Sequence, residues 1–328
     1  MDRALWFVAP RRVELRPIDL PPPSADSVRI RTLCSGVSSG TELLAYRGQL
    51  PADLPVDESL PGLDGSFTYP FQYGYSAVGE VEQGVDGAGL APGGLVFAFR
   101  PHQERFDAGP DELVRVDGLT PRRAVMLPYV ETALQVALDA GPVLRETVVV
   151  CGLGVLGVLV ARLLEDAGAQ VIGSEPQRWR RDLAAAAGIT SVAPDELSDA
   201  AREAGAVPLA IECSGHPAAL APLLDVVDHE GTVLVASWYG TNEVSLPLGG
   251  SFHRRRLTIR STQVSTIPAA LSGRWSHRRR VRHAVRLAGV LPLDELATDT
   301  VPFDAAADGY ARLDSGAEGV MHVAFGYS

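Results

Sequence analysis

Lysine is absent from this sequence of 328 residues, so all 29 basic residues are arginine. Without lysine the chain cannot form a lysine Schiff base, a phosphate-binding loop that depends on lysine, or a serine–lysine catalytic pair. The Tyr-x-x-x-Lys proton relay is excluded for the same reason. Any proton transfer by this chain must therefore use other side chains.

Cysteine is also scarce, and Cys34, Cys151 and Cys213 show neither a paired nor a metal-binding spacing. A reduced cytoplasm is the expected location. No apolar run reaches the length of a membrane-spanning helix, and the start of the chain, which breaks at Pro10, is too short and mixed for a secretion signal. The net charge of −11 disfavours a nucleic acid or an anionic membrane as partner.

The most informative motif that is present is a strand followed by Gly152-x-Gly154-x-x-Gly157 and an apolar helix. The first glycine permits a tight turn, the second lets the backbone approach a pyrophosphate, and the third lets the helix pack close to the strand. The helix N-terminus supplies N–H groups to the phosphates. We therefore predict a dinucleotide site that includes Gly152, Gly154, Val155, Leu156 and Gly157. The alternative is a tight strand–helix turn with chance glycines.

Two kinds of sequence pattern divide the chain. Residues 1–120 carry short β-branched or alternating runs separated by proline and glycine, which indicates a β-rich domain. Residues 121–291 alternate strands with helices, which predicts a doubly wound parallel sheet. An alternating strand at Gly319–Phe325 predicts that residues 292–328 return to the β-rich domain. The fold class is therefore α/β with a second, β-rich domain.

Four further motifs resemble those of the medium-chain dehydrogenase/reductase superfamily. Gly74–Val81 is similar to its G-H-E-x-x-G-x-V turn, and Ser35–Glu42 to its G-x-C-x-T/S-D segment, with one extra residue after the first glycine. Pro92–Val96 matches a P-G-D-x-V turn, and Pro302–Ala307 matches a C-terminal helix signature. The resemblance implies a GroES-like catalytic domain and a Rossmann domain, with hydride transfer in the cleft between them and a homodimer as the usual assembly.

Within that superfamily, the chain most resembles the branch typified by bacteriochlorophyllide dehydrogenases. The motifs are those at Ser35–Glu42 and Gly74–Ser76, together with Pro101–Phe106 and Glu131–Leu134. The branch is broad, so the resemblance does not assign a substrate.

The zinc ligands that the resemblance would imply are replaced. Ser39 stands at the cysteine position and Tyr75 at the histidine position, and the four-cysteine loop of many members is missing. Serine and tyrosine hydroxyls are poor zinc ligands, so we predict no zinc. The alternative is a rebuilt site that uses Glu42, His102 or Glu131.

Without zinc, hydroxyl groups or a histidine must handle the proton. Thr41 matches the position that relays a proton in the family, and Tyr75 and Ser39 replace ligands. His102 lies in a loop that the resemblance places near the cleft, and imidazole has a suitable pKa for acid–base catalysis. For each of these the alternative is structural: a turn hydroxyl bonded to its own backbone, a packed tyrosine, or a solvated histidine.

The cofactor choice depends on an acid at the end of the second strand of the parallel sheet. Glu175 can accept hydrogen bonds from both ribose hydroxyls and repels a 2′-phosphate, which favours NAD. NADP is the alternative, with its phosphate held by Arg178, Arg180 or Arg181. The resemblance places Cys213, Ser214 and Ser237 along the cofactor, after later strands.

Ten arginines fall within residues 254–286, and residues 244–293 contain no acid. Three interpretations compete: a solvated face beside a dimer seam, a pocket for a phosphorylated or carboxylated substrate, and, least favoured, a nucleic-acid surface. The NADP phosphate is a fourth.

The sequence thus predicts a zinc-independent, NAD(P)-dependent oxidoreductase that interconverts a secondary alcohol and a ketone on a small-molecule substrate. Two alternatives remain open. One is a zinc-free enoyl or quinone reductase on the same fold, and the other is a cofactor-binding protein without catalysis.

Overall fold

The computed structural model describes residues 1–57, 62–85 and 87–328. The chain forms two compact units: Met1–Pro128 with Val285–Ser328, called here the β-rich unit, and Tyr129–Ala284, called here the parallel-sheet unit. The sequence places the boundaries after residues 120 and 291. In the structure they fall inside two helices, α3 (Leu127–Ala140) and α9 (His277–Ala288).

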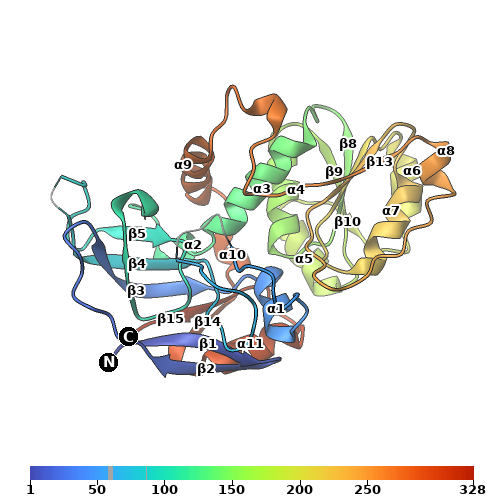
Figure 1. Ribbon diagram of the computed structural model, residues 1–328. Coiled ribbons are helices and arrows are strands. Elements are labelled where there is room, and N and C mark those ends of the chain that lie inside the picture. The colour runs from blue at the N-terminus through green and yellow to red at the C-terminus, as the bar shows by residue number, and fades with distance from the viewer. Residues whose placement is uncertain (58–61, 86) are drawn as a thin grey trace. The chain divides into compact units, whose positions relative to one another are not determined.

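The β-rich unit contains a hairpin and a larger mixed sheet (Figure 1). The hairpin pairs β1 (Arg3–Ala9) with β2 (Arg12–Pro17) in antiparallel fashion. The larger sheet has the order β14-β15-β3-β4-β5-β7, and β6 pairs with β3. Its strands are β3 (Val28–Gly36), β4 (Ala77–Gln83), β5 (Leu95–Ala98), β6 (Arg105–Ala108), β7 (Val114–Arg115), β14 (Asp299–Pro302) and β15 (Val323–Gly326).

Aromatic side chains from distant parts of the sequence form the core of this unit. Phe7 stacks on Phe71 with ring centroids 5.2 Å apart, and Tyr310 meets Phe7 edge-on at 5.3 Å. Because Tyr310 and Phe325 belong to the end of the chain, the C-terminal return completes the core. The helices are α1 (Thr41–Arg47), α2 (Pro121–Ala124), α10 (Leu293–Leu296) and α11 (Ala306–Asp314), with 3-10 turns at Pro110–Glu112 and Phe303–Ala305.

The parallel-sheet unit has the strand order β10-β9-β8-β11-β12-β13, and all of these pairs are parallel. Its strands are β8 (Thr147–Cys151), β9 (Gln170–Ser174), β10 (Ser191–Val192), β11 (Leu209–Glu212), β12 (Thr232–Val235) and β13 (Thr258–Ser261). Helices α4 (Val155–Asp166), α5 (Arg178–Ala186), α6 (Leu197–Ala204) and α7 (Leu220–Val226) accompany it (Figure 1). Strands covered on both faces need continuous apolar runs, and β8 and β11 are buried along nearly their whole length.

This arrangement confirms the predicted doubly wound sheet. Chain connections leave β8 in both directions across the sheet, so the carboxyl ends of β8 and β11 form the switch point where such folds bind ligands. Between β12 and α9 lie α8 (Ser251–Arg254), β13 and a 3-10 turn at Ala269–Leu271. Within the described part of the chain, no helix is both long and apolar enough to cross a membrane.

Candidate active site

The glycine turn after β8 has the geometry that the motif predicts. Gly152 has a φ of 89°, and a Cβ placed there would lie 2.5 Å from Ser214 Cα. A Cβ on Gly157 would overlap the carbonyl oxygen of Gly152. A Cβ on Gly154, by contrast, would meet nothing within 4 Å. The outer two glycines are therefore required by close packing, whereas the middle one faces open space of the kind that a pyrophosphate needs.

Helix α4 begins at this open space. Gly154 is its N-cap residue, and Val155 and Leu156 form its first turn, which contains no acidic residue. The unpaired N–H groups of that turn and the helix dipole favour an anion there. The rest of the helix packs through buried residues such as Val158 and Leu159. The residues of this turn therefore fit the diphosphate of a dinucleotide.

Glu175 follows β9 and turns toward the glycine turn. Its carboxylate, 3% exposed, accepts hydrogen bonds from Leu153 N and Gln177 N, both at 3.0 Å. Each oxygen keeps a further lone pair. The carboxylate therefore stabilises the turn and can still accept a hydrogen bond from a ribose hydroxyl.

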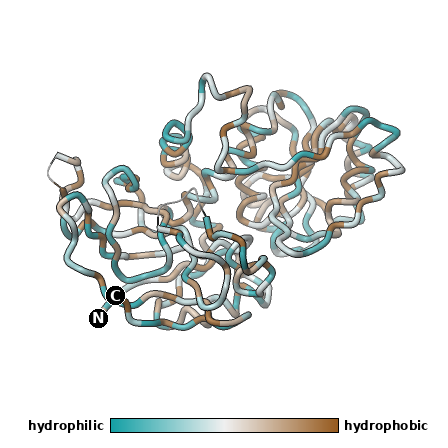
Figure 2. Tube along the Cα trace, viewed as in Figure 1, coloured by the Kyte–Doolittle hydropathy of each residue, from teal (hydrophilic) through white to brown (hydrophobic). Residues whose placement is uncertain are grey.

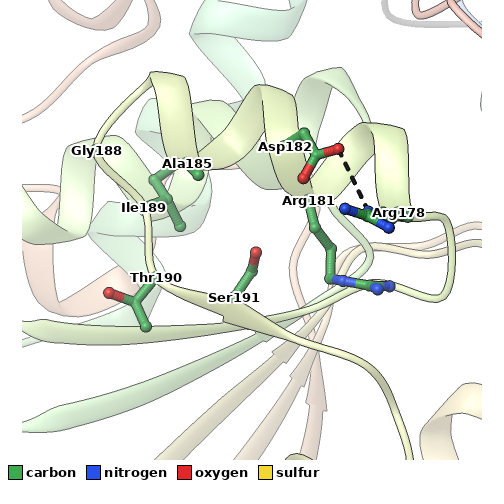
Figure 3. A pocket seen from close by; sticks show the side chains of 8 residues that line it. All are labelled: Arg178, Arg181, Asp182, Ala185, Gly188, Ile189, Thr190 and Ser191. Atoms are coloured by element: carbon green, nitrogen blue, oxygen red, sulfur yellow. Dashed lines mark ion pairs between the residues drawn. The ribbon is translucent and has the colours of Figure 1, made fainter.

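The arginines after Glu175 line a shallow pocket between α5 and β10 (Figure 3). Arg181 Nη1 donates to the carbonyl oxygens of Glu175 and Pro176, at 2.7 and 2.9 Å. The side chain of Arg178 is 87% exposed and lies 3.9 Å from Asp182. Arg181 is thus engaged with the backbone, and Arg178 extends into solvent.

The remaining predicted cofactor residues gather at the same edge of the sheet. Gly215 N donates to Ser237 Oγ at 2.8 Å, which joins the segment after β11 to the segment after β12. Ser214 donates through N and Oγ to the buried carboxylate of Glu212. Burial raises the pKa of the Cys151 thiol to about 12, and it raises that of Cys213 as well. These cysteines are therefore neutral thiols rather than nucleophiles.

In the β-rich unit, Tyr75 contacts the turn that precedes α1. Its phenol donates a hydrogen bond to Ser38 Oγ at 2.5 Å. Ser38 lies two residues before Gly40, the N-cap of α1, in the turn that also holds Ser39, and Thr41 is the first residue of the helix. Tyr75, Ser39 and Thr41 are thus attached to one turn. Ser38 was missed in the sequence because the extra residue after Gly36 leaves the register of the two serines undecided.

His102 lies in the loop between β5 and β6, as expected, but its side chain is buried rather than solvated. Its side chain is fully buried, with Nε2 2.8 Å from Glu42 Oε2 and Nδ1 2.7 Å from Ser35 Oγ. Both ring nitrogens are therefore occupied, and a proton donor for the substrate needs access that His102 lacks. The buried aromatic core around it, which includes Tyr310 and Phe325, explains this placement.

The residues do not fit a zinc ion. Ser39 and Tyr75 offer hydroxyls, and the Tyr75 phenol hydrogen-bonds to Ser38. Glu42 and His102 bind each other, while Glu131 forms an ion pair with Arg280, 2.9 Å apart and buried. Across residues 1–57, 62–85 and 87–328, no group of three or more His, Cys, Asp or Glu side chains is arranged to hold a metal.

The arginine block, all of it described, spreads over several elements. Arg280 is buried against Glu131 and Gln135 of α3, and Arg255 donates to the carbonyl oxygens of Asp225 and Val227. Exposed arginines recur at every fourth position along α9, where Figure 2 shows hydrophilic residues: these are Arg278, Arg282 and Arg286, which we call the α9 row. The block is therefore divided between buried or half-buried structural arginines and one exposed row.

Comparison with known proteins connects this geometry to a family. Residues 152–277 match the model of the zinc-binding dehydrogenase family. The chain is 28% identical to 2-desacetyl-2-hydroxyethyl bacteriochlorophyllide A dehydrogenase of Cereibacter sphaeroides, over 95% of this chain and 94% of that protein. It is also 28% identical to the protein of the same name from Rhodobacter capsulatus, over 84% of this chain and 82% of the relative.

Solved structures show the same fold at lower identity. An Escherichia coli alcohol dehydrogenase complexed with NADH has a TM-score of 0.79 at 16% identity, and 2R,3R-butanediol dehydrogenase of Bacillus subtilis has 0.79 at 18%; both alignments cover 99% of each chain. A Sinorhizobium meliloti zinc-binding dehydrogenase bound to NADP has 0.76 at 18%, also with 99% of each chain covered. The sequence matches and the glycine turn together support the predicted resemblance to the medium-chain dehydrogenase/reductase superfamily. The chain is an NAD(P)-dependent oxidoreductase of the alcohol dehydrogenase type, similar over residues 152–277 to the zinc-binding dehydrogenase family and over most of its length to the bacteriochlorophyllide dehydrogenases.

Proposed function

We propose that this enzyme interconverts a secondary alcohol and a ketone without zinc, using side-chain hydroxyls for proton transfer. The observation that carries the proposal is the 2.5 Å hydrogen bond between Tyr75 and Ser38, because it joins two hydroxyls where the family binds a metal. The names of the two curated relatives, which refer to a hydroxyethyl group in a desacetyl compound, support an alcohol at the reacting carbon.

The nicotinamide cofactor supplies or accepts the hydride, and the chain's own residues move the proton. In the oxidation direction the alcohol loses its O–H proton as hydride leaves the carbon, so a hydroxyl oxygen must accept that proton. Tyr75 is half-buried and bonded to Ser38. As the Tyr75 oxygen accepts the substrate proton, Tyr75 passes its own proton to Ser38 Oγ and Ser38 releases its hydroxyl proton to water, so each oxygen keeps a single proton. Thr41 and Ser39, in and beside the same turn, are positioned to bind the substrate oxygen or the ribose.

NAD is the proposed cofactor. The carboxylate of Glu175 lies beside the glycine turn, where such a group disfavours a 2′-phosphate and accepts from ribose hydroxyls. Arg181 is engaged with two backbone carbonyls, so binding a phosphate there would require it to give up those bonds. Arg178 is exposed and remains the group most able to accommodate NADP.

A carboxylated or phosphorylated substrate is the final part of the proposal. It is supported by the α9 row, because guanidinium groups bind such anions through paired hydrogen bonds. If the proposal is correct, catalytic efficiency with an anionic alcohol should decrease as salt is added, whereas a neutral alcohol should be less affected.

The purified protein can be tested for metal content, cofactor affinity and hydride transfer in parallel. We expect less than stoichiometric zinc, a lower Kd for NAD⁺ than for NADP⁺, and a rise in absorbance at 340 nm with secondary alcohols such as 2,3-butanediol and glycerol 3-phosphate. Stoichiometric zinc that is needed for activity would refute the metal-free mechanism. Reduction of enones but of no ketone would identify an enoyl or quinone reductase, and cofactor binding without turnover on any substrate would identify a non-catalytic protein.

A further inference from the structure

A buried hydrogen-bond network lies beneath the Ser38–Tyr75 pair. Glu42 Oε2 accepts from Tyr310 Oη at 2.5 Å and from His102 Nε2 at 2.8 Å. Ser35 Oγ lies 2.7 Å from His102 Nδ1 and 2.8 Å from Tyr327 Oη. Burial raises the pKa of both tyrosines, so each stays protonated and can donate. Every polar group of the network is thereby satisfied, which buried groups require.

One end of this network is attached to the turn that holds Ser38. Glu42 Oε1 accepts from Ser38 N at 2.8 Å, and Ser38 O accepts from Glu42 N at 3.0 Å. These reciprocal bonds close the turn from Ser38 to Glu42. Because the carboxylate is fully buried, its position is set by its partners rather than by solvent. A change at His102 is therefore transmitted through Glu42 to the backbone of Ser38.

The other end of the network is in contact with the backbone next to Tyr75. Gly74 has a φ of 114°, and a Cβ placed on it would lie 2.7 Å from His102 Cδ2 and Nε2. The imidazole ring thus packs directly on Gly74, where no side chain has room. His102 is therefore in contact with both segments that carry the hydroxyl pair: it reaches Ser38 through Glu42 and touches the residue before Tyr75.

We propose that Glu42 and His102 are positioning residues that hold the Ser38 and Tyr75 hydroxyls at bonding distance. This proposal rests on the proposed function for its catalytic consequence, but the positioning itself does not require catalysis. The hydrogen bond from Ser38 N to Glu42 fixes the position of the turn, and the packing of the His102 ring fixes the position of the backbone at Gly74. Small displacements of reacting groups reduce rates strongly, by as much as about 100-fold for a shift of about 1 Å.

The test combines a spectroscopic probe with kinetics on the full-length enzyme. Tyr75 is replaced by 3-fluorotyrosine, and the ¹⁹F resonance is compared in the parent, His102→Gln, Ser38→Ala and Tyr327→Phe. His102→Gln and Ser38→Ala should both shift the resonance. Tyr327→Phe is the matched control, because it also removes one buried hydroxyl of the network, but that hydroxyl bonds Ser35 Oγ rather than Glu42, Gly74 or the turn at Ser38. It should leave the resonance near that of the parent.

In unlabelled protein, with 2,3-butanediol or glycerol 3-phosphate as substrate, His102→Gln should lower kcat about 10- to 100-fold. The Kd for NAD⁺ should stay unchanged, because the glycine turn lies in the other unit. The kcat of the control, Tyr327→Phe, should stay within about twofold of the parent value. An unchanged ¹⁹F resonance in His102→Gln, with a shift in Ser38→Ala, would overturn the proposal.

If His102→Gln fails to fold, the near-isosteric Glu42→Gln takes its place with the same expected shift. If the parent transfers no hydride to any substrate, the proposed function fails, and the resonance still decides the positioning.

Discussion

Tyr75 and Ser38 are 37 positions apart in sequence, yet the phenol of Tyr75 donates to Ser38 Oγ at 2.5 Å. A pair of hydroxyls at this distance can relay a proton without a metal, because the first passes its own proton along the hydrogen bond and the second releases one to water. The first serves as the accessible group, since Tyr75 is half-buried, and the second is buried and held by Glu42. If Tyr75 and Ser38 relay the proton together, removing either hydroxyl should slow catalysis.

Tyr75→Phe and Ser38→Ala should each lower kcat for alcohol oxidation, by about 100-fold for the tyrosine, because general acid–base groups typically contribute that much or more. The ring of phenylalanine keeps the packing against Tyr73, whose centroid is 5.9 Å away. Steady-state kinetics with 2,3-butanediol and an enone provide the measurement. Equal rates for parent and Tyr75→Phe on the alcohol would contradict the role of Tyr75, and enone reduction should be nearly unaffected if it occurs.

The glycine turn predicts different effects for two similar substitutions, one on stability and one on NAD⁺ binding. Gly157→Ala should destabilise the fold, since its Cβ would overlap the carbonyl oxygen of Gly152. Gly154→Ala should fold normally, because its Cβ meets nothing within 4 Å, but it should weaken NAD⁺ binding by filling the space beside the α4 N-terminus.

Thermal unfolding without cofactor and fluorescence titration with NAD⁺ separate the two effects. Gly154→Ala serves as the control for Gly157→Ala, since both add one methyl group to the same turn. Normal NAD⁺ affinity in Gly154→Ala would show that the open space is not the pyrophosphate site.

The parallel sheet was largely predictable because each of its central strands is an apolar run joined to a helix by a turn with glycine. Strands β8 (Thr147–Cys151) and β11 (Leu209–Glu212) are such runs, within residues 121–291, where the sequence predicts strands that alternate with helices. Strands β1 and β6 were not predicted. In β1 buried and half-buried positions follow each other irregularly, and β6 is a short run with alternating charges. Tertiary pairing, and not local pattern, makes them strands.

The candidate site was predictable to the level of segments but not of atoms. The turn at residues 35–42 and the tyrosine at 75 were expected to supply hydroxyls, and the structure brings Tyr75 to that turn. The bond between Ser38 and Tyr75 joins residues 37 positions apart, and the enclosure of His102 by Tyr310 and Phe325 joins residues more than 200 positions apart. No local pattern in the sequence carries that information.

The α9 row leads to a prediction in which one substitution raises stability and weakens the binding of an anionic substrate. Arg278, Arg282 and Arg286 are spaced by four residues, so neighbouring guanidinium groups repel each other along the helix. Arg282→Glu should stabilise the protein by about 1 kcal/mol at low salt, because it replaces repulsions with i,i+4 attractions. If the row binds an anionic substrate, the same change should raise KM for glycerol 3-phosphate relative to 2,3-butanediol.

Arg254→Glu is the matched control, since Arg254 is exposed and outside α9. Urea unfolding at low and high salt measures the change in the free energy of unfolding, and steady-state kinetics measure KM for the two substrates. If Arg282→Glu changes the KM of neither substrate and gains stability, the row is a solvated face. A loss of stability in Arg282→Glu would contradict the repulsion argument.

Arg280 and Glu131 form the buried ion pair that joins α9 to α3, 2.9 Å apart. The Arg280 side chain is 2% exposed and also donates to Gln135. Arg280→Met should cost about 3 to 5 kcal/mol of unfolding free energy, because it leaves a buried carboxylate without its partner. The double variant Glu131→Gln with Arg280→Met should recover most of that loss, since no charge then remains buried. Urea unfolding of the parent and both variants provides the measurement.

The pH dependence of this loss identifies its cause. Burial raises the pKa of Glu131, and Arg280 partly opposes that rise, so removal of Arg280 should raise the folded-state pKa further above the unfolded one. A group whose pKa is raised by folding favours the folded state below its unfolded pKa, and this contribution disappears as pH rises through the folded pKa. The deficit of Arg280→Met relative to the parent should therefore be smaller at pH 5 than at pH 8, and the double variant should show no such trend. An equal deficit at both pH values would mean that lost packing of the long arginine side chain, rather than the uncompensated charge of Glu131, destabilises the protein.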